Sequence, residues 1–232
     1  MMQFKDRTEA GQLLAKQLFS AYANRSDVLV KALPRGGVPV AYEVAKALNA
    51  PLDVFVVQKL GVPGCEDLAM GATASGGFRV INDDIVRSHH IPYPVIDRAA
   101  KTASRQLWRR EHLYRGNMGF SECDPTPLDV FDATVIVVDD GIATGATMRA
   151  AIIALRQQQP ARIIIAVPVA PAIAYAELRT EVDDVFCLLT PVHIYGLSGW
   201  YDLFPPVSDQ QVQHLLALAS LESCSIAQTG LK

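Results

Sequence analysis

Two adjacent carboxylates, Asp139 and Asp140, directly follow a β-branched run at 134–138. That run predicts a strand buried on both faces, which places the acidic pair at its carboxyl end. A small-residue loop and a helix-forming segment come next. Free N–H groups at the helix start would bind a phosphate, with hydroxyl donors from Thr144 and Thr147. Carboxylates beside such a site suit a sugar phosphate, because they accept hydrogen bonds from vicinal hydroxyl groups.

A sugar that carries two phosphate groups accounts for both halves of this pattern. Gly145 would let the backbone approach the oxygens of one phosphate closely. The acidic pair can attract the magnesium ion of a polyphosphate group on the same sugar. A Walker B strand is the alternative reading of an apolar run that ends in Asp. Its partner sequence G-x-x-x-x-G-K-[ST] is absent, and so is the dinucleotide fingerprint G-x-G-x-x-G.

The stretch from Val137 to Thr147 resembles the phosphoribosyl pyrophosphate (PRPP) signature of type I phosphoribosyltransferases. The resemblance implies that Asp139 and Asp140 hold the ribose hydroxyl groups, while the loop after them grips the 5′-phosphate. The loop residues that it assigns to PRPP are Gly141, Ala143, Thr144, Gly145, Ala146 and Thr147. It also implies that Mg²⁺ arrives with PRPP and lies near the acidic pair, with no dedicated metal site.

A second anion site is predicted at Pro34-Arg35-Gly36-Gly37, which follows a strand expected at 28–33. The two glycines expose consecutive N–H groups, and the guanidinium of Arg35 can bind a phosphate with two parallel hydrogen bonds. By itself the sequence is equally compatible with a tight strand-to-helix turn. The family carries a pyrophosphate-binding loop after its first core strand, so the resemblance assigns Arg35, Gly36 and Gly37 to the pyrophosphate.

The segment of about 59–77 is rich in glycine and predicts a long loop without regular structure, after a strand expected at 52–57. In the family the corresponding segment is a mobile cover over the pyrophosphate, often with a basic residue at its base. The resemblance therefore implies a lid here, and it assigns Lys59 to the catalytic residues. Where relatives commonly have a second basic residue, this chain has Gln58.

Aromatic residues gather between 190 and 206. They either close the edge of the sheet or form a small hood on which a heterocyclic base stacks. Under the second interpretation Trp200 and Tyr201 bind the base.

The composition indicates a folded chain with a sizeable core: 50% of the residues are hydrophobic, 19% are charged, and the net charge is −3 without a basic block. This balance argues against a nucleic-acid or membrane-surface protein. No signal peptide or membrane span is visible, and the four cysteines lack C-x-x-C spacing. We therefore expect reduced thiols, a cytoplasmic location, and no nucleic-acid or membrane partner.

Strand and helix patterns alternate along the chain and predict one α/β domain over 1–232, a parallel twisted sheet with helices on both faces. Ligands of such sheets bind beyond the carboxyl ends of the strands, where both anion loops would lie. Helices are predicted at 6–24, 39–49, 93–115, 146–158, 171–179 and 212–221. Further strands are predicted at 78–81, 162–167 and 185–189, and 223–232 is expected to be a frayed tail.

The resemblance implies a pentosyltransferase that moves the 5-phosphoribosyl group of PRPP to a small nitrogenous acceptor, with release of pyrophosphate. A nucleobase is the expected acceptor. Relatives that use 6-oxopurines tend to have an acid where this chain has Ala143, whereas adenine-using relatives have a small residue there. Two alternatives stay open: a non-catalytic regulator that senses PRPP or a nucleotide, and a phosphoribosyl hydrolase or phosphorylase. Arg35 and Lys59 together favour an enzyme. The sequence leaves room for a homodimer without predicting one.

Overall fold

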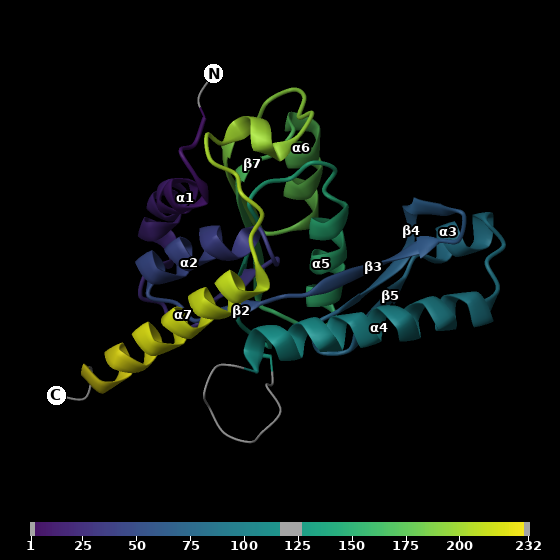
Figure 1. Cartoon of the computed structure of the whole chain (residues 1–232), viewed down its shortest axis with the longest axis horizontal. Coiled ribbons are helices and arrows are strands. Elements are labelled where there is room, and N and C mark those ends of the chain that lie inside the picture. The colour runs from purple at the N-terminus through teal and green to yellow at the C-terminus, as the bar shows by residue number, and fades with distance from the viewer. Residues whose placement is uncertain (1–2, 117–126, 230–232) are drawn as a thin grey trace.

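A parallel sheet of five strands forms the centre of the molecule, in the order β2-β1-β6-β7-β8 (Figure 1). The computed structural model describes residues 3–116 and 127–229. The strands of this sheet are β1 (Val28–Ala32), β2 (Leu52–Val54), β6 (Thr134–Val138), β7 (Arg162–Val169) and β8 (Asp184–Leu189). The sheet confirms the predicted α/β class, because every neighbouring pair of these strands runs parallel.

Strands β1 and β6 form the centre of the sheet, and their side chains alternate between its two faces. Val30, Ile136 and Val138 belong to the core on one face, whereas Val135 and Val137 belong to the core on the other. All residues of both strands are buried. The continuous apolar sequence of β6 is therefore explained by burial on both sides, as in other parallel sheets.

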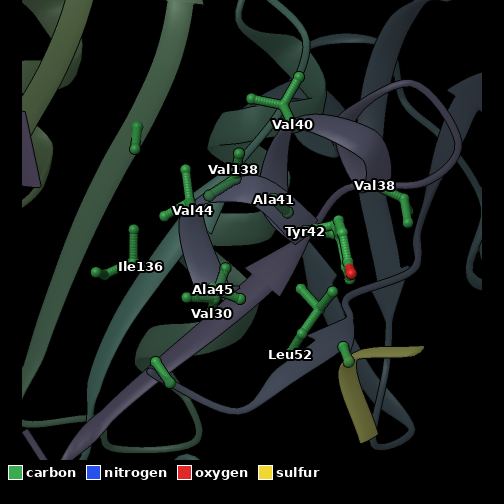
Figure 2. Packing of buried hydrophobic residues seen from close by; sticks show 14 of the residues in the cluster. Val30, Val38, Val40, Ala41, Tyr42, Val44, Ala45, Leu52, Ile136 and Val138 are labelled. Carbon is green, nitrogen blue, oxygen red and sulfur yellow. The ribbon is translucent and has the colours of Figure 1, made fainter. Parts of the chain in front are cut away.

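Helices cover both faces, as predicted. The first face carries α1 (Arg7–Tyr22), α2 (Gly37–Leu48) and α7 (Asp209–Thr229), whose apolar residues share one core cluster with the sheet. Figure 2 shows residues of α2, among them Val40 and Val44, near Ile136 and Val138 of β6. The other face carries α5 (Ala146–Arg156) and α6 (Ala172–Glu181).

A second sheet forms an arm beside the first (Figure 1). Its antiparallel strands are β3 (Val57–Val62), β4 (Cys65–Ala74) and β5 (Phe78–Ile81), and α3 (Asp83–Ser88) and α4 (Tyr93–Arg115) follow them. Leu60, Val62 and Met70 pack against Ile96 and Ala100 of α4 in a small core of their own. The helix at 93–115 and the strand at 78–81 are confirmed.

The irregular loop predicted for 59–77 is wrong, because most of this segment is strand. Leu68, Met70, Ala72 and Ala74 occupy alternate positions along β4, but the glycines of the segment make its sequence resemble that of a loop. Gly71 is required by packing: a Cβ there would lie 2.3 Å from the carbonyl oxygen of Val80 on β5. Gly64 has φ +79° at the turn between β3 and β4. The glycines thus serve a tightly paired sheet, and movement of this arm as a lid stays a prediction.

A buried ion network connects the arm to the central sheet. Lys31 of β1 donates to Asp53 of β2 at 2.7 Å, and Arg115, the last residue of α4, donates to the same carboxylate at 2.9 Å. Arg115 also donates to the carbonyl oxygen of Val54 at 2.9 Å. The three charged side chains are at most 3% exposed. The end of α4, and with it the arm, is therefore fixed to the edge of the sheet.

The expected frayed tail is corrected in part, because α7 continues to Thr229 and residues 230–232 lie outside the described part of the chain. Within the described residues, no helix combines the length and the apolar character that a membrane crossing requires.

Candidate active site

The acidic pair stands at the carboxyl end of β6, as predicted. Asp139 is partly exposed and Asp140 is buried. The backbone N–H of Asp140 donates to Oδ1 of Asp139 at 2.8 Å. Burial and the neighbouring Asp140 carboxylate raise the pKa of Asp139 well above its ordinary value. Two acidic side chains thus lie close together where the strand ends. A ligand with hydroxyl groups would stabilise their charged forms by donating hydrogen bonds to them.

The turn Pro34–Gly37 lies directly on this pair. A Cβ at Gly36 would lie 2.1 Å from Oδ2 of Asp140, and one at Gly37 would lie 2.7 Å from the carbonyl oxygen of Val138. Both positions therefore accept only glycine without a shift of backbone or carboxylate. The peptide bond between Pro34 and Arg35 is cis. These contacts place the turn directly beside the acidic pair at the end of β6. That the turn and the loop 141–147 serve one ligand stays a prediction.

Arg35 extends from the turn toward solvent, and its side chain is 53% exposed. Its Nη1 lies 3.6 Å from Oδ1 of Asp209, at the start of α7. A long pair of this kind at the surface is weak, so the guanidinium remains available to an anion at the turn.

The loop 141–147 forms the other wall. Gly141 has φ +154°, and a Cβ there would lie 2.6 Å from Cδ2 of Leu197. Gly145 has φ +77° and precedes the first turn of α5. The backbone N–H of Ile142 donates to the carbonyl oxygen of Val169 at 2.8 Å, which anchors the loop to β7. The residues of the loop whose side chains are exposed are Ala143, Thr144, Ala146 and Thr147. An exposed loop at a helix N-terminus suits a phosphate.

Arg149 of α5 contacts this loop, and sequence analysis did not identify it. Its Nε donates to Glu181 at 3.0 Å and its Nη2 donates to Glu177, both on α6. Its Nη1 lies 3.5 Å from the carbonyl oxygen of Thr144. No sequence signal marks these contacts, because they depend on the packing of α5 against α6.

Arg7 is a second residue that sequence analysis missed. It lies in the first turn of α1, 133 positions before Asp140, yet its Nε donates to Oδ2 of Asp140 at 2.8 Å. Its Nη1 donates to the carbonyl oxygen of Pro205 at 2.8 Å, and its guanidinium lies 3.7 Å from the ring centroid of Phe204. The helix was expected only to cover the sheet. Its N-terminus in fact reaches the acidic pair.

The hood at 190–206 contains a short 3₁₀ helix, η1 (Leu197–Trp200). Tyr201 is 4% exposed, and its ring packs between Phe4 and Phe204, at centroid distances of 5.4 and 4.7 Å. Its hydroxyl donates to the carbonyl oxygen of Asp140 at 2.5 Å, and burial raises its pKa. The prediction that Tyr201 offers a stacking face is therefore wrong. Trp200 is partly exposed, and its stacking role stays a prediction.

The structure places Lys59 on the arm. It lies on β3 and lines a cavity of about 570 Å³ between that strand and α4, with Arg98 and Gln106 among its neighbours. No residue that lines this cavity belongs to the turn 34–37 or to the stretch 139–147. Its contact with pyrophosphate stays a prediction.

The candidate site has two loops whose sequences suit anions, one on each side of a pair of carboxylates. This spacing of positive and negative groups suits a sugar with phosphate at one end and a charged leaving group at the other. In the described part of the chain, no group of three or more His, Cys, Asp or Glu side chains could hold a metal ion. The partly exposed carboxylate of Asp139 could supply an oxygen ligand to a magnesium ion.

Similar proteins match most of this chain. Two Mycobacterium tuberculosis proteins, from strains CDC 1551 / Oshkosh and ATCC 25618 / H37Rv, bear the name "Putative phosphoribosyl transferase" and are each 42% identical over 212 residues. The match covers 91% of this chain but only 46% of each relative, so the chain spans about half their length. The crystal structure of TT1426 from Thermus thermophilus is 35% identical, with a TM-score of 0.81, and the match covers 94% of this chain and 99% of that one. The family model of the phosphoribosyl transferase domain matches residues 3–199. The chain therefore belongs to the phosphoribosyltransferase family.

Proposed function

We propose that this chain transfers the 5-phosphoribosyl group of PRPP to a nitrogenous acceptor. The observation that carries the proposal is the close packing of the turn 34–37 on Asp140, because it would bring a pyrophosphate bound at the turn directly beside a sugar bound by the acidic pair. The loop 143–147 would bind the 5′-phosphate at the other end of the sugar. The anomeric carbon would then lie between the two loops, open to an incoming nitrogen.

The reaction breaks the bond between C1 of the ribose and the pyrophosphate oxygen, and it forms a bond from C1 to the acceptor nitrogen. Pyrophosphate leaves with the bonding electrons, and the acceptor nitrogen loses a proton. The guanidinium of Arg35 and the N–H of Gly36 would hold the leaving group. Gly37 would shape the turn, because its own N–H already donates to the carbonyl oxygen of Leu33 at 3.1 Å. Asp139 would orient the ribose hydroxyl groups. Magnesium, delivered with PRPP, would offset charge on the pyrophosphate beside the acidic pair.

Positioning and charge stabilisation are the main contributions that we expect from the protein. Asp139 is partly exposed, and in this proposal its carboxylate would lie near the positive charge that develops on the sugar ring. Exclusion of water would protect PRPP from hydrolysis, and the arm that carries Lys59 is our candidate for that cover. We expect PRPP and a small nitrogenous acceptor as partners. The cytoplasmic location and a homodimer remain parts of this proposal.

The acceptor is proposed from one position. Ala143 is exposed in the loop and has no acidic group that could take a proton from a 6-oxopurine. We therefore propose adenine ahead of hypoxanthine or guanine, and Trp200 as the side chain against which the base stacks.

The direct test incubates the protein with PRPP, Mg²⁺ and a panel of nucleobases and measures pyrophosphate release and nucleotide formation. Nucleotide formed with one base supports the proposal. PRPP cleaved without an acceptor would indicate the hydrolase alternative, and PRPP bound without any cleavage would indicate a sensor.

The 5′-phosphate site has its own test. Ribose 5-phosphate should raise the Tm of the wild-type protein, because a ligand that binds only the folded state stabilises it. Gly145→Val should abolish that shift by distorting a loop that needs φ +77°. Gly77→Val is the matched control, since Gly77 has φ +78° in the turn between β4 and β5. A folded Gly145→Val protein that is still stabilised would contradict the placement.

A further inference from the structure

The two aspartates of the acidic pair differ in the partners of their carboxylates. Oδ2 of Asp140 lies 2.8 Å from both Nε and Nη2 of Arg7, and each side chain is 10% exposed. Oδ1 of Asp139 accepts the backbone N–H of Asp140 at 2.8 Å. Within the described residues, no cationic side chain forms an ion pair with Asp139. Only one of the two carboxylates is thus committed to the protein.

Arg7 is held in place before any ligand arrives. Besides Asp140, it contacts the carbonyl oxygen of Pro205 and the face of the Phe204 ring. The segment just before α1 is joined to the hood by backbone hydrogen bonds, from Phe4 to Trp200 at 2.9 Å and from Asp202 to Phe4 at 2.8 Å. A guanidinium fixed on both sides loses little freedom when it holds a carboxylate.

The Asp140 carboxylate in turn supports the pyrophosphate turn. A Cβ at Gly36 would lie 2.1 Å from Oδ2 of Asp140 and 2.9 Å from its Oδ1, so the turn rests on this carboxylate. The hydroxyl of Tyr201 fixes the backbone of Asp140 at the same point. The N-terminal segment, the hood and the turn therefore meet at one side chain.

We propose that Arg7 is a positioning residue, which holds the Asp140 carboxylate beneath the turn 34–37 and leaves Asp139 to meet the ribose hydroxyl groups. The inference rests on the proposed function, and it divides the acidic pair into a supporting acid and a sugar-binding acid. Arg7 acts through Asp140 and does not touch the substrate. A competing role predicts the opposite effect on PRPP binding. If Arg7 only paired with Asp140 until the ribose displaced it, removal of Arg7 would tighten PRPP binding.

The test compares Arg7→Met with Arg7→Lys, and uses Arg25→Met as the control because Arg25 pairs with Asp27 at the surface. Arg7→Met should lower kcat by a factor on the order of 100, as expected for a small misplacement of the reacting groups, with a smaller change in KM for PRPP. Arg7→Lys should recover part of the loss, and Arg25→Met should behave as wild type.

A second readout needs no ligand. In the free protein the Gly37 N–H donates to Leu33 at 3.1 Å and the Val38 N–H donates to Arg35 at 3.2 Å. Amide exchange at these two positions should become faster in Arg7→Met than in Arg25→Met. Because Arg7→Met leaves a buried carboxylate without its cation and could unfold the chain, the double variant Arg7→Met/Asp140→Asn is made as well. The kcat of the double variant should be less than about threefold below that of the single variant Asp140→Asn.

Wild-type kcat with wild-type exchange in Arg7→Met would overturn the inference, and so would tighter PRPP binding with unchanged kcat. A further large loss in the double variant would also overturn it, because Arg7 would then act independently of Asp140. If the wild-type protein neither binds nor cleaves PRPP, the proposed function fails. The exchange comparison still decides whether Arg7 positions the turn.

Discussion

Asp53 and Asp139 lie in two clusters of charged side chains, and their surroundings shift their pKa values in opposite directions. Asp53 lies between Lys31 and Arg115, which lower its pKa although burial alone would raise it. At the end of β6, burial and the charge of Asp140 raise the pKa of Asp139. One carboxylate is stabilised as an anion by the fold, while the other is held close to a like charge.

The difference separates a structural network from a functional site. The Asp53 network satisfies its groups with short hydrogen bonds and connects the arm to the sheet. The acidic pair receives one cation for two carboxylates and faces two loops that suit anions. A charged side chain without a partner of opposite charge destabilises the fold. Proteins keep such groups mainly where a bound ligand supplies the missing partner.

The largest effect is expected at the unbalanced pair. Replacement of both Asp139 and Asp140 by Asn should reduce PRPP turnover below detection, because neutral amides stabilise the sugar and support the turn far less well. The near-identical shape of Asn should keep the chain folded. Steady-state pyrophosphate release and a circular dichroism spectrum check both statements. A double variant that turns over PRPP at the wild-type rate would mean that the pair is not the sugar site.

The second prediction concerns the balanced network. Asp53→Asn should lower the free energy of unfolding by about 3–5 kcal/mol, because two buried cations lose their shared partner. Since the pKa of Asp53 is lowered by folding, its contribution is present above the ordinary Asp value of about 4 and is lost as pH falls below it. Urea unfolding at pH 7 and at pH 3 measures this difference.

Two controls sharpen the second prediction. Asp97→Asn removes the partner of Arg79 in a surface pair and should leave stability unchanged. The kcat of folded Asp53→Asn should stay within about twofold of wild type if the network is structural only. A large loss of kcat without loss of stability would erase the distinction between the two regions.

The sequence predicted the central part of the site because that part is local. A strand, an acidic end, a glycine-containing loop and a helix follow one another within 134–156, and parallel topology brings the turn 34–37 to the same edge. What the sequence left unpredicted is set by packing between distant elements. Arg7 reads as one polar residue of an amphipathic helix, and nothing nearby marks Asp140 as its partner.

One long-range feature did leave a signal. Lys31 interrupts the apolar run of β1, and a charge in a strand buried on both faces requires an opposite charge in the fold. That reasoning predicts an acid on a neighbouring strand, and Asp53 is paired across from Lys31 on β2. The arm left a misleading signal, because glycines that allow close strand pairing are also typical of loops.

The third prediction asks whether the arm, which the balanced network holds in place, takes part in the chemistry. Lys59 lies on β3 and lines the cavity between that strand and α4, and the lid prediction requires it to act on bound PRPP when the arm closes. Lys59→Ala should lower kcat by a factor on the order of 100, with a modest change in PRPP affinity. Lys101→Ala, at an exposed position on α4, is the control. Equal kcat values for the two variants would leave the arm without a catalytic role.

The smallest effect comes from the cost of the unbalanced pair itself. The raised pKa of Asp139 means that the folded state favours its neutral form, so its unfavourable contribution appears only as pH rises above the ordinary Asp value of about 4. Asp139→Asn removes a charge that the fold disfavours, and it should raise the Tm at pH 8 but not at pH 4. A gain near 1 kcal/mol corresponds to about 2–4 °C for a domain of this size.

Thermal unfolding of wild type and Asp139→Asn across this pH range measures the gain. Asp27→Asn is the opposite control, because Arg25 lowers the pKa of Asp27 to about 2. That control should show no gain at pH 8. If Asp139→Asn lowers the Tm at pH 8, the Asp139 carboxylate is balanced in the folded protein after all, and the contrast with Asp53 fails.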